Sequence, residues 1–454
     1  MGRIVRGMDS SPEGRKTPTL AHPDVIGAGP RSTRGGDKRG EAGIVLPMRR
    51  VCFLTGTRAE FGLMRSVLRE IQSHRGLTLQ IIATGMHLDR SRGQTIKQIR
   101  KEGWRVDAIA PWKRDVPPAI ATGSAMAAIA AALSRLKSDI VLVVGDRVEA
   151  FAGAAAGAIG GRVVAHVHGG DRALGQVDDS LRHAITKLAH IHFPATATSA
   201  KRIERLGEEK WRIHCVGSPG LDGILDEAAT AKTVAEICPQ PFALLVLHPV
   251  DGNVAAEKRR AEMILNATLA GIGGREGKDP HPRPHLRQAQ GRLPEYRQRE
   301  QQVGRVVIIH PNNDPGSNGI VAAWAAASRD GRCVVKTNVP RSQFLGLLRD
   351  AALLVGNSSA GIIEAASFGT PVVDIGPRQM GRERGGNVQH VACERAKIAA
   401  AIENIWNNAR PKRKIAENIY SLGVERADGA GRKIADILGR AALDGRLRRK
   451  LISY

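Results

Sequence analysis

Titratable side chains follow two buried apolar runs in the first half of the sequence. Asp146 comes directly after IVLVVG, and His168 and Asp171 come directly after RVVAHV. A strand buried on both faces does not end in an aspartate without a partner, because an unpaired charge is costly to bury. Two adjacent strand ends with such groups predict proton abstraction next to a carbonyl or acetal carbon. Capping of the following helix is the alternative role for Asp146.

The segment DDSLRHAITKLAH adds two charged candidates. Leu181, Ile185 and Leu188 recur at i, i+4 and i+7, which predicts a helix with these three side chains on its core face. Asp178 and Arg182 lie one turn apart on another face. There a surface i, i+4 ion pair is the alternative to a role in a site.

The second half of the sequence contains candidates of a different kind. LLVLHPV places His248 at the end of an apolar run, where a histidine can be catalytic or structural. In LLVGNSSAGIIEAASFGTPVV, Ser358 and Ser359 open a helix after a strand, and the free N–H groups there can bind a diphosphate. Glu364 lies a turn further on, where a carboxylate can accept hydrogen bonds from ribose hydroxyls. Ordinary N-capping is the alternative for the serines.

The segment LTGTRAEFG joins the first predicted strand to the first predicted helix. An anion is favoured at such a junction, so Arg58 is a candidate phosphate ligand. Any Rossmann-like unit can begin in this way, which is the structural alternative. The segment is not G-x-G-x-x-G, and this lowers the expectation of a dinucleotide cofactor.

Short apolar runs alternate with segments of helix length, which predicts βαβ units. The first series is VCFLT, LQIIATG, IVLVVGD, RVVAHVHGG, IHFPA and IHCVG. The second series is ALLVLHP, VVIIHPN, CVVKTN, LLVGNSS and PVVDIG. The repetition predicts an α/β protein of two doubly wound, Rossmann-like domains with a crevice between them.

We place these domains at residues 49–225 and 226–395. Residues 1–48 lack apolar periodicity and are predicted to be a disordered leader. Residues 273–304 are nearly free of apolar side chains and are predicted to be a flexible loop between a helix and a strand, away from the ligand crevice. Residues 396–454 are expected to form helices that pack back on the first domain.

The overall composition excludes several classes of protein. The formal charge is +24, but the excess is spread over the leader, the loop and the tail, which argues against a dedicated nucleic-acid function. The five cysteines form no C-x-x-C pair, so a zinc ribbon or a disulfide framework is not indicated, and a reducing cytoplasm fits. Neither a membrane span nor a secretory signal is recognisable in the sequence.

The motifs together resemble one family, over about Arg49 to Val391. The resemblance rests on GTRAEFG, TGMHL, GDRVEA, HVHGGD, DDSLRHAITKLAH, LHPV, PNNDPGS, GNSSAGIIEAASFGTPV and RQMGRERGGNV, in that order. This ordered set is similar to the UDP-N-acetylglucosamine 2-epimerase family. It looks most like the hydrolysing branch used for sialic-acid-type sugars, in which G-T-R-A-E, H-G-G and D-D-S-x-R-H-A-I-T-K-L are typical.

The resemblance implies a glycosyltransferase-B-like fold in which the second domain holds most of the UDP. It implies a UDP-sugar substrate, no metal and no nicotinamide, and we expect a homo-oligomer. The family reaction removes the proton at C2, expels UDP by anti elimination to give a 2-acetamidoglucal, and adds water with inversion at C2. The products of the hydrolysing branch are UDP and N-acetylmannosamine.

Site residues follow from the same resemblance, position by position. The catalytic candidates are Asp146, Asp171, His168, Asp178, Arg182 and His248. The substrate-binding candidates are Arg58, Asn312, Ser358, Ser359 and Glu364. The chain departs from its relatives at two of these positions, because many relatives have Glu in place of Asp171 and non-hydrolysing ones have Glu in place of His168.

Two kinds of alternative function remain open at this point. Within enzymes, a non-hydrolysing epimerase or a glycosyltransferase of the same fold would use the same UDP cradle. The other class is a protein that binds nucleic acid or a membrane surface through its basic extensions. Salt-sensitive binding that survives removal of the leader and the loop would favour this second class.

The leader prediction can be tested by truncation. Deleting residues 1–47 should change the melting temperature by no more than about 2 °C, because the segment has no apolar pattern with which to join a core. Deleting residues 1–55 is the control, since it also removes the run VCFLT and should abolish cooperative unfolding. A large loss of melting temperature in the shorter deletion would contradict the prediction.

Overall fold

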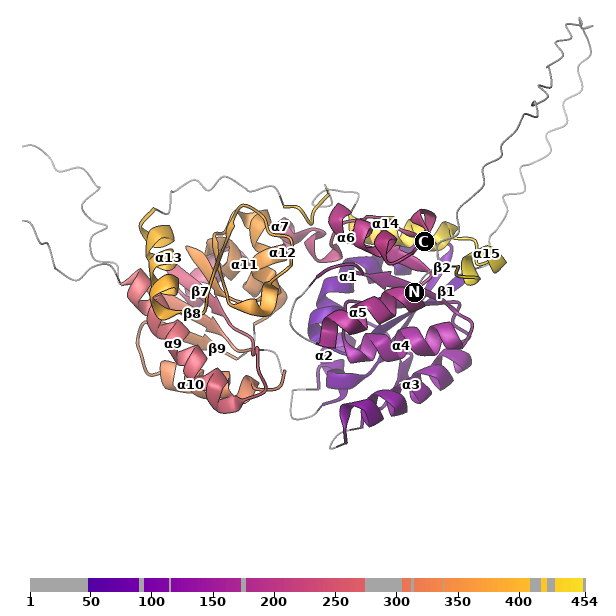
Figure 1. Ribbon diagram of the computed structural model, residues 1–454, viewed down its shortest axis with the longest axis horizontal. Helices are drawn as coiled ribbons and strands as arrows, with labels where there is room; N and C mark the ends of the chain where they lie inside the picture. Colours follow the sequence, from indigo (N-terminus) through magenta and orange to yellow (C-terminus); the bar gives the residue numbers. More distant parts are fainter. Residues whose placement is uncertain are drawn as a thin grey trace, which may run out of the picture. The chain divides into compact units, whose positions relative to one another are not determined.

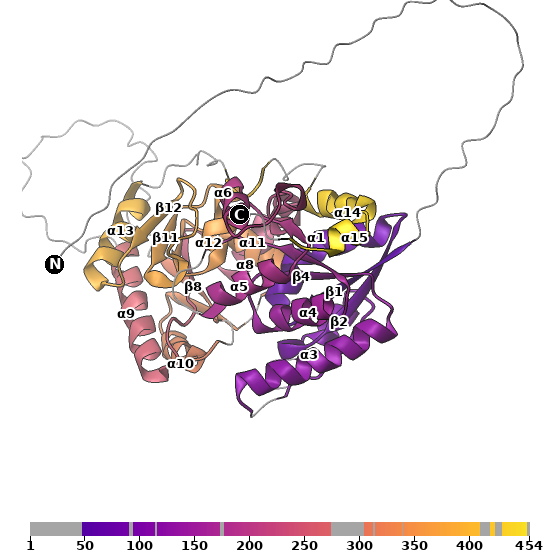
Figure 2. The ribbon, with the colours of Figure 1, turned by 45° about the vertical axis from the view of Figure 1, so that its right-hand side comes forward.

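The structure is a computed structural model that describes residues 48–89, 94–113, 116–172, 177–273, 304–311, 314–337, 339–408, 418–422 and 429–451. It contains two six-stranded parallel sheets with helices on both faces (Figures 1 and 2). The predicted α/β fold with two doubly wound units is therefore confirmed. Among the described residues, no helix combines the length and the apolar character needed to cross a membrane.

The first sheet and its helices are formed by residues 49–205. The strands are β1 (Arg49–Thr55), β2 (Leu77–Ala83), β3 (Ala108–Ile109), β4 (Ile140–Val144), β5 (Val163–Val167) and β6 (Ile191–Phe193). The helices are α1 (Arg58–Ser73), α2 (Ile96–Lys101), α3 (Pro118–Arg135), α4 (Val148–Ile159), α5 (Val177–Leu188) and α6 (Ala197–Arg205). The sheet order is β3-β2-β1-β4-β5-β6.

The second sheet repeats this order. Its strands are β7 (Phe242–Val246), β8 (Arg305–Ile309), β9 (Cys333–Lys336), β10 (Leu353–Gly356), β11 (Val372–Ile375) and β12 (Val388–Val391), arranged β12-β11-β10-β7-β8-β9. The remaining helices are α7 (Ile224–Glu227), α8 (Ala231–Ile237), α9 (Val254–Ile272), α10 (Ser317–Ala327), α11 (Arg341–Asp350), α12 (Ser359–Ile363), α13 (Arg395–Asn408), α14 (Ala430–Arg440) and α15 (Gly445–Arg448).

Alternating side chains of the central strands explain why both faces of each sheet are covered. In β1, Val51 and Phe53 pack with α1 and α14, whereas Cys52 and Leu54 pack with α3 and α4 on the other face. Each of these four side chains is at most 3% exposed. The same division holds in β7, where even and odd positions belong to different core clusters. Strands buried on both faces read as continuous apolar runs, which is why the sequence revealed them.

The strand order places β1 beside β4 and β7 beside β10. In each sheet the chain reverses its direction of winding at this pair, so the helices after the two strands leave on opposite faces. Ligands of open α/β sheets bind outside the carboxyl ends of the strands at this switch point. A ligand site is therefore expected at the residues that follow β1, β4, β7 and β10, and at the end of β5, which pairs with β4.

Three short segments differ from the strands that the sequence predicted. IHCVG was expected to be a strand, but it forms a single bridge between Ile213 and His192. The strands β3 and β12 were not predicted. β3 has only two residues, and β12 is the edge strand VQHV, in which Gln389 and His390 are exposed. Apolar runs cannot reveal strands that bury so little side chain.

The C-terminal helices pack on different sheets. α13 packs against α9 in the second half, while α14 packs against α1 in the first (Figure 1). The backbone N–H groups of Ala430 and Gly431 at the start of α14 donate to the Asp222 carboxylate, at 2.9 and 2.7 Å. The domain limits at residues 225 and 395 remain a prediction. The predicted leader and most of the predicted loop lie outside the described residues.

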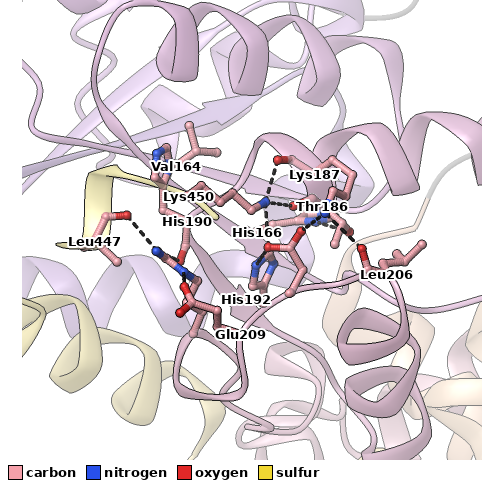
Figure 3. A network of polar contacts seen from close by, with 12 residues as sticks. Val164, His166, Thr186, Lys187, His190, His192, Leu206, Glu209, Leu447 and Lys450 are labelled. Carbon is pink, nitrogen blue, oxygen red and sulfur yellow. Dashed lines mark hydrogen bonds and ion pairs between the residues drawn. The ribbon is translucent and has the colours of Figure 1, made fainter. Parts of the chain in front are cut away.

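A buried ionic network ties the last described residues to the first sheet (Figure 3). The Glu208 carboxylate pairs with Lys187 Nζ and Lys450 Nζ, each at 2.7 Å, and with His192 Nε2 at 3.1 Å. Lys450 Nζ also donates to the carbonyls of Thr186 and Lys187 at the end of α5, at 3.0 and 2.6 Å. Burial alone would raise the pKa of Glu208, but the hydrogen bonds from His192, Lys187 and Lys450 outweigh it and lower this pKa to about 2.

This network predicts a specific acid sensitivity. Because the folded-state pKa of Glu208 lies below its ordinary value of 4.5, its stabilisation is complete above that pH and is lost as the pH falls towards about 2. The shift corresponds to roughly 3 kcal/mol of unfolding free energy. Urea unfolding from pH 7 to pH 3 should show a smaller pH-dependent loss in Glu208→Gln than in the wild type.

The Glu208→Gln variant should also be less stable than the wild type at pH 7, since it leaves Lys187 and the largely buried Lys450 without their anionic partner. Glu262→Gln is the matched control, because Glu262 lies on α9 with its side chain 43% exposed and should leave the profile unchanged. Parallel stability profiles for Glu208→Gln and the wild type would show that this carboxylate does not govern the acid limb.

Candidate active site

Arg182 links the ends of two neighbouring strands. Asp146 follows β4 through Gly145, whose φ of +77° turns the chain at the edge of the sheet. The Arg182 guanidinium on α5 binds the Asp146 carboxylate and donates to the His168 carbonyl at 3.1 Å. The Arg182 side chain is only 2% exposed, whereas that of Asp146 is 23% exposed. Arg182 is therefore a buried connection between strand ends and not part of a surface helix face.

His168 and Asp171 form a second polar pair beside this connection. His168 Nδ1 lies 3.0 Å from Asp171 Oδ2, and His168 Nε2 lies 3.1 Å from Ser218 Oγ. The other oxygen of Asp171 accepts from Ser199 Oγ at 3.0 Å. His168 has a φ of +60°, an unusual backbone conformation for a residue with a side chain, which points to a strained strand end.

The electrostatics of this pair fix the charge of the carboxylate. Burial alone would raise the pKa of Asp171, but His168, through charge and hydrogen bonding, and the Arg182 guanidinium hold the pKa well below its usual range. An ionised Asp171 orients the His168 ring and selects its tautomer. Ser199 and Ser218, which complete this arrangement, were missed in the sequence because serines far from the motifs have no spacing that marks them.

Asn357 holds His248 against the end of the neighbouring strand in the second sheet. Asn357 Oδ1 accepts from the His248 backbone N–H at 2.7 Å, and Asn357 Nδ2 donates to the His248 carbonyl at 2.8 Å. Gly356, the last residue of β10, has a φ of +135°, and a Cβ atom there would lie 2.0 Å from the Val246 carbonyl oxygen. Only glycine fits this close approach of the two strand ends.

The two serines lie at the start of α12. Ser358 is the N-cap residue, and its hydroxyl accepts from the Ala360 N–H at 3.3 Å. Ser359 is the first helical residue and is half-buried. The capping role considered for these serines therefore occurs at Ser358, and a capping hydroxyl can still offer hydrogen bonds to a ligand.

Arg341 holds the Glu364 carboxylate. Arg341 Nη1 donates to Glu364 Oε1 at 2.9 Å, and Arg341 Nε donates to Glu227 Oε2 at 3.0 Å. The Arg341 side chain is 19% exposed and that of Glu364 is 16% exposed, so both are partly accessible. Arg341 could not be predicted from the sequence, because it begins a different helix, 23 positions before its partner, and no motif connects the two.

The structure brings some of the predicted residues together and leaves others apart. One contact group lies at the carboxyl ends of β4 and β5 and consists of Asp146, Arg182, His168 and Asp171. His248, Ser358, Ser359 and Glu364 follow the switch-point strands of the second sheet. Arg58 is exposed at the start of α1. Asn312 and the side chain of Asp178 lie outside the described residues.

In the part of the chain that the structure describes, no group of three or more His, Cys, Asp or Glu side chains is placed to hold a metal ion. The polar groups at the strand ends instead combine a carboxylate, an imidazole and a guanidinium. These groups can transfer protons and bind anions directly.

The strands of the first doubly wound sheet end in titratable side chains, and a strand of the second leads into a helix N-terminus with two serines. Together these features define an α/β protein suited to a phosphorylated ligand. The sequence matches the model of the UDP-N-acetylglucosamine 2-epimerase family over residues 69–271 and 280–439. The chain belongs to this family.

Similar proteins include enzymes with two different names. The chain is 31% identical over 361 residues to the UDP-N-acetylglucosamine 2-epimerase of Neisseria meningitidis serogroup B, covering 78% of this chain and 87% of that one. It is 32% identical over 390 residues to the UDP-N,N'-diacetylbacillosamine 2-epimerase (hydrolyzing) of Legionella pneumophila, covering 83% of this chain and 93% of that one. Both relatives thus support the family, and only one of the two is named as hydrolyzing.

Solved structures support the fold. The N. meningitidis UDP-GlcNAc 2-epimerase bound to UDP-GlcNAc aligns with a TM-score of 0.65 and 18% identity over 86% of this chain and 99% of that chain. The complex of S. aureus MnaA with UDP aligns with a TM-score of 0.68 and 15% identity over 86% of this chain and 96% of that chain. At these identities the likeness establishes the shared two-sheet architecture.

The Asn357 clamp on His248 gives a testable consequence. Asn357→Ala removes both hydrogen bonds and leaves a partly buried N–H and carbonyl without them, so the unfolding free energy should fall by roughly 2 kcal/mol. Asn357→Asp keeps the acceptor but loses the donor, so its unfolding free energy should also be lower than that of the wild type. Chemical unfolding measures both changes.

Asn408→Ala is the matched control for this measurement. Asn408 lies at the exposed end of α13, so its removal should change the unfolding free energy by less than about 0.5 kcal/mol. If Asn357→Ala were as stable as Asn408→Ala, the two bonds would not be holding the strand end.

Proposed function

We propose that this protein is a hydrolysing UDP-N-acetylglucosamine 2-epimerase, which converts UDP-N-acetylglucosamine and water into UDP and N-acetylmannosamine. The observation that supports this most directly is the contact group at the edge of the first sheet. There the buried guanidinium of Arg182 binds the partly exposed carboxylate of Asp146 and the backbone carbonyl of His168, whose imidazole is the second titratable group. Removing a proton from carbon and returning one to the opposite face requires two such groups.

The proposed reaction has two stages. First, a base takes the proton from C2 of the sugar while the bond between C1 and the UDP oxygen breaks, so that a double bond forms between C1 and C2 and UDP leaves. Second, water adds to the resulting 2-acetamidoglucal, with its hydroxyl going to C1 and a proton going to C2 from the face opposite to the first. The stereochemistry at C2 is thereby inverted.

The contacts suggest how the two proton-transfer roles are divided. Asp146 retains an exposed fraction of 23%, and we assign it one of the roles. Asp171 Oδ2 lies against His168 Nδ1, so we assign Asp171 the task of orienting the His168 ring. His168 Nε2, which lies 3.1 Å from Ser218 Oγ, is then the second proton-transfer atom. This arrangement follows the common pattern of an imidazole directed by a carboxylate.

We assign UDP to the second sheet. The hydroxyl groups of Ser358 and Ser359 and the free N–H groups at the start of α12 suit a diphosphate, and Glu364 suits the ribose hydroxyls. Arg341 would keep the Glu364 carboxylate in place for this contact. We include Arg58 as a phosphate ligand, and Asn312, Asp178 and His248 as further site residues, on the family resemblance.

The hydrolysing subtype rests on two further points. The H-G-G and DDSLRHAITKL segments of this chain resemble that branch. In addition, the L. pneumophila relative, 32% identical, is named as hydrolyzing. Its name also favours a second candidate substrate, UDP-N,N'-diacetylbacillosamine, which would undergo the same two stages. Both UDP-sugars should therefore be assayed side by side.

Isotope labelling tests this proposal. Run in D₂O and H₂¹⁸O, the reaction should release free UDP and N-acetylmannosamine with deuterium at C2 and ¹⁸O at C1, read by NMR and mass spectrometry before anomeric exchange.

The variant Asp146→Asn should bind UDP normally, and its rate should fall by a factor of about 10² to 10⁴. Asp139→Asn is the control, because Asp139 pairs with Arg50 just before β4, at the opposite end of that strand.

The alternative outcomes are distinct. Product that keeps its original hydrogen at C2 would exclude the elimination route. UDP-N-acetylmannosamine without free UDP would assign the protein to the non-hydrolysing branch. Transfer of the sugar to an acceptor, with no change at C2, would indicate a glycosyltransferase of the same fold.

A further inference from the structure

We propose that His166 is a positioning residue for this reaction. Together with Thr186 it holds the turn that carries Asp146 and the helix that carries Arg182 in one fixed arrangement. The inference rests on the proposed function, since it assumes that the Asp146–Arg182 pair serves catalysis. His166 itself is the fourth of the five residues of the strand β5, and its side chain is fully buried.

The His166 ring bonds to the Asp146 turn on one side. His166 Nε2 lies 2.8 Å from the carbonyl oxygen of Gly145, the residue directly before Asp146. A carbonyl can only accept, so Nε2 must carry the ring proton. The other ring nitrogen, Nδ1, lies 3.2 Å from Thr186 Oγ1 and accepts its hydroxyl proton. A single neutral tautomer therefore satisfies both contacts.

The surroundings keep this tautomer neutral. Burial lowers the pKa of His166 to about 3, against the opposing effect of the hydrogen bond to Gly145, and the neighbouring His192, Arg182 and His168 disfavour a second proton. The ring therefore stays in one charge state over the pH range in which such an enzyme would work. A group with a fixed charge and fixed bonds suits a positioning role better than proton transfer.

Thr186 connects the ring to the helix that carries Arg182. Thr186 lies four residues after Arg182 on α5, so the two are one helical turn apart. Its carbonyl accepts from Lys450 Nζ at 3.0 Å, which fixes the end of the helix from the other side (Figure 3). His166 thus contacts the supports of both partners in the Asp146–Arg182 pair, through Gly145 and through Thr186.

Gly169, two residues after the end of β5, fits the same arrangement. A Cβ atom on Gly169 would lie 2.9 Å from His166 Nδ1 and 3.2 Å from Thr186 Oγ1. A side chain there would intrude on the bond between the ring and the hydroxyl. The first glycine of the HVHGGD motif therefore leaves room for the His166–Thr186 contact.

Loss of this support should affect the chemical step more than binding. A displacement of about 1 Å in a catalytic group can cost roughly 10² in rate. UDP, assigned to the second sheet, does not depend on the position of Asp146. Substitution of His166 or Thr186 should therefore lower kcat and leave KM and the affinity for UDP close to the wild type.

Two matched pairs of variants test the inference. His166→Phe keeps a ring but removes both bonds, and it should lower kcat roughly 10- to 100-fold, whereas His166→Gln, which can still donate to the Gly145 carbonyl, should recover much of that loss. Thr186→Val should lower kcat several-fold, and Thr186→Ser should match the wild type. UDP affinity by calorimetry should stay within about twofold in all four.

The double variant His166→Phe/Thr186→Val adds a readout that a general packing defect would not produce. Because Thr186 acts through His166, the double variant should be no slower than His166→Phe alone. Additive losses, equal losses in His166→Phe and His166→Gln, or a loss of UDP affinity matching the loss in kcat would overturn the inference. Should His166→Phe fail to fold, the comparison of Thr186→Val with Thr186→Ser decides alone.

NMR separates this inference from the proposed function. In ¹⁵N-histidine-labelled wild type, with the signal assigned from His166→Gln, the ring should show a protonated Nε2 and a bare Nδ1, unchanged from pH 5.5 to pH 8. A titrating ring or the opposite tautomer would overturn the positioning role even if the enzyme is active. A wild type that turns over neither UDP-sugar would refute the proposed function, whatever tautomer is found.

Discussion

The buried guanidinium of Arg182 is the constraint on which the first half of the structure depends. A cation with a 2% exposed side chain is tolerated only where acceptors surround it, and the Asp146 carboxylate and the His168 carbonyl supply them. These acceptors stand at the ends of two neighbouring strands, so the pairing fixes the relative position of both ends. The Asp146 carboxylate is partly exposed, whereas the Arg182 side chain that binds it is almost completely buried. The geometry of the candidate site is thus set from inside the protein.

The two sheets share a strand order but place different chemistry at their switch points. At the edge of the first sheet, charged and titratable side chains gather, and buried contacts hold each of them. At the carboxyl ends of the strands of the second sheet, Gly356 and Asn357 bring two strand ends together directly before the short helix α12. The first arrangement suits proton transfer and the second suits binding of a phosphorylated group. A repeated fold can in this way divide the tasks of catalysis and substrate binding between its halves.

Lys450 helps to hold this arrangement in place. Lys450 caps the last carbonyls of α5 and pairs with Glu208, so residues at the C-terminus hold the helix on which Arg182 lies. Burial lowers the pKa of Lys450 to about 8, against the opposing hydrogen bond and charge of Glu208. Breaking a buried ion pair of this kind leaves an unpaired charge in the interior. Its value lies in fixing one arrangement of the helix.

The class of fold, most strands and the family could be predicted from the sequence, because strands buried on both faces are continuous apolar runs and because strand-end motifs such as GDRVEA and HVHGGD are local. Asp146, His168 and Asp171 were candidates on the same grounds. The hydrogen-bond partners of these residues became known only from the folded structure. An i, i+4 spacing cannot tell a surface ion pair from a buried link to a strand 36 positions away, which is what Arg182 makes with Asp146. Side-chain hydrogen bonds join residues that are distant in the chain, and local patterns hold no record of them.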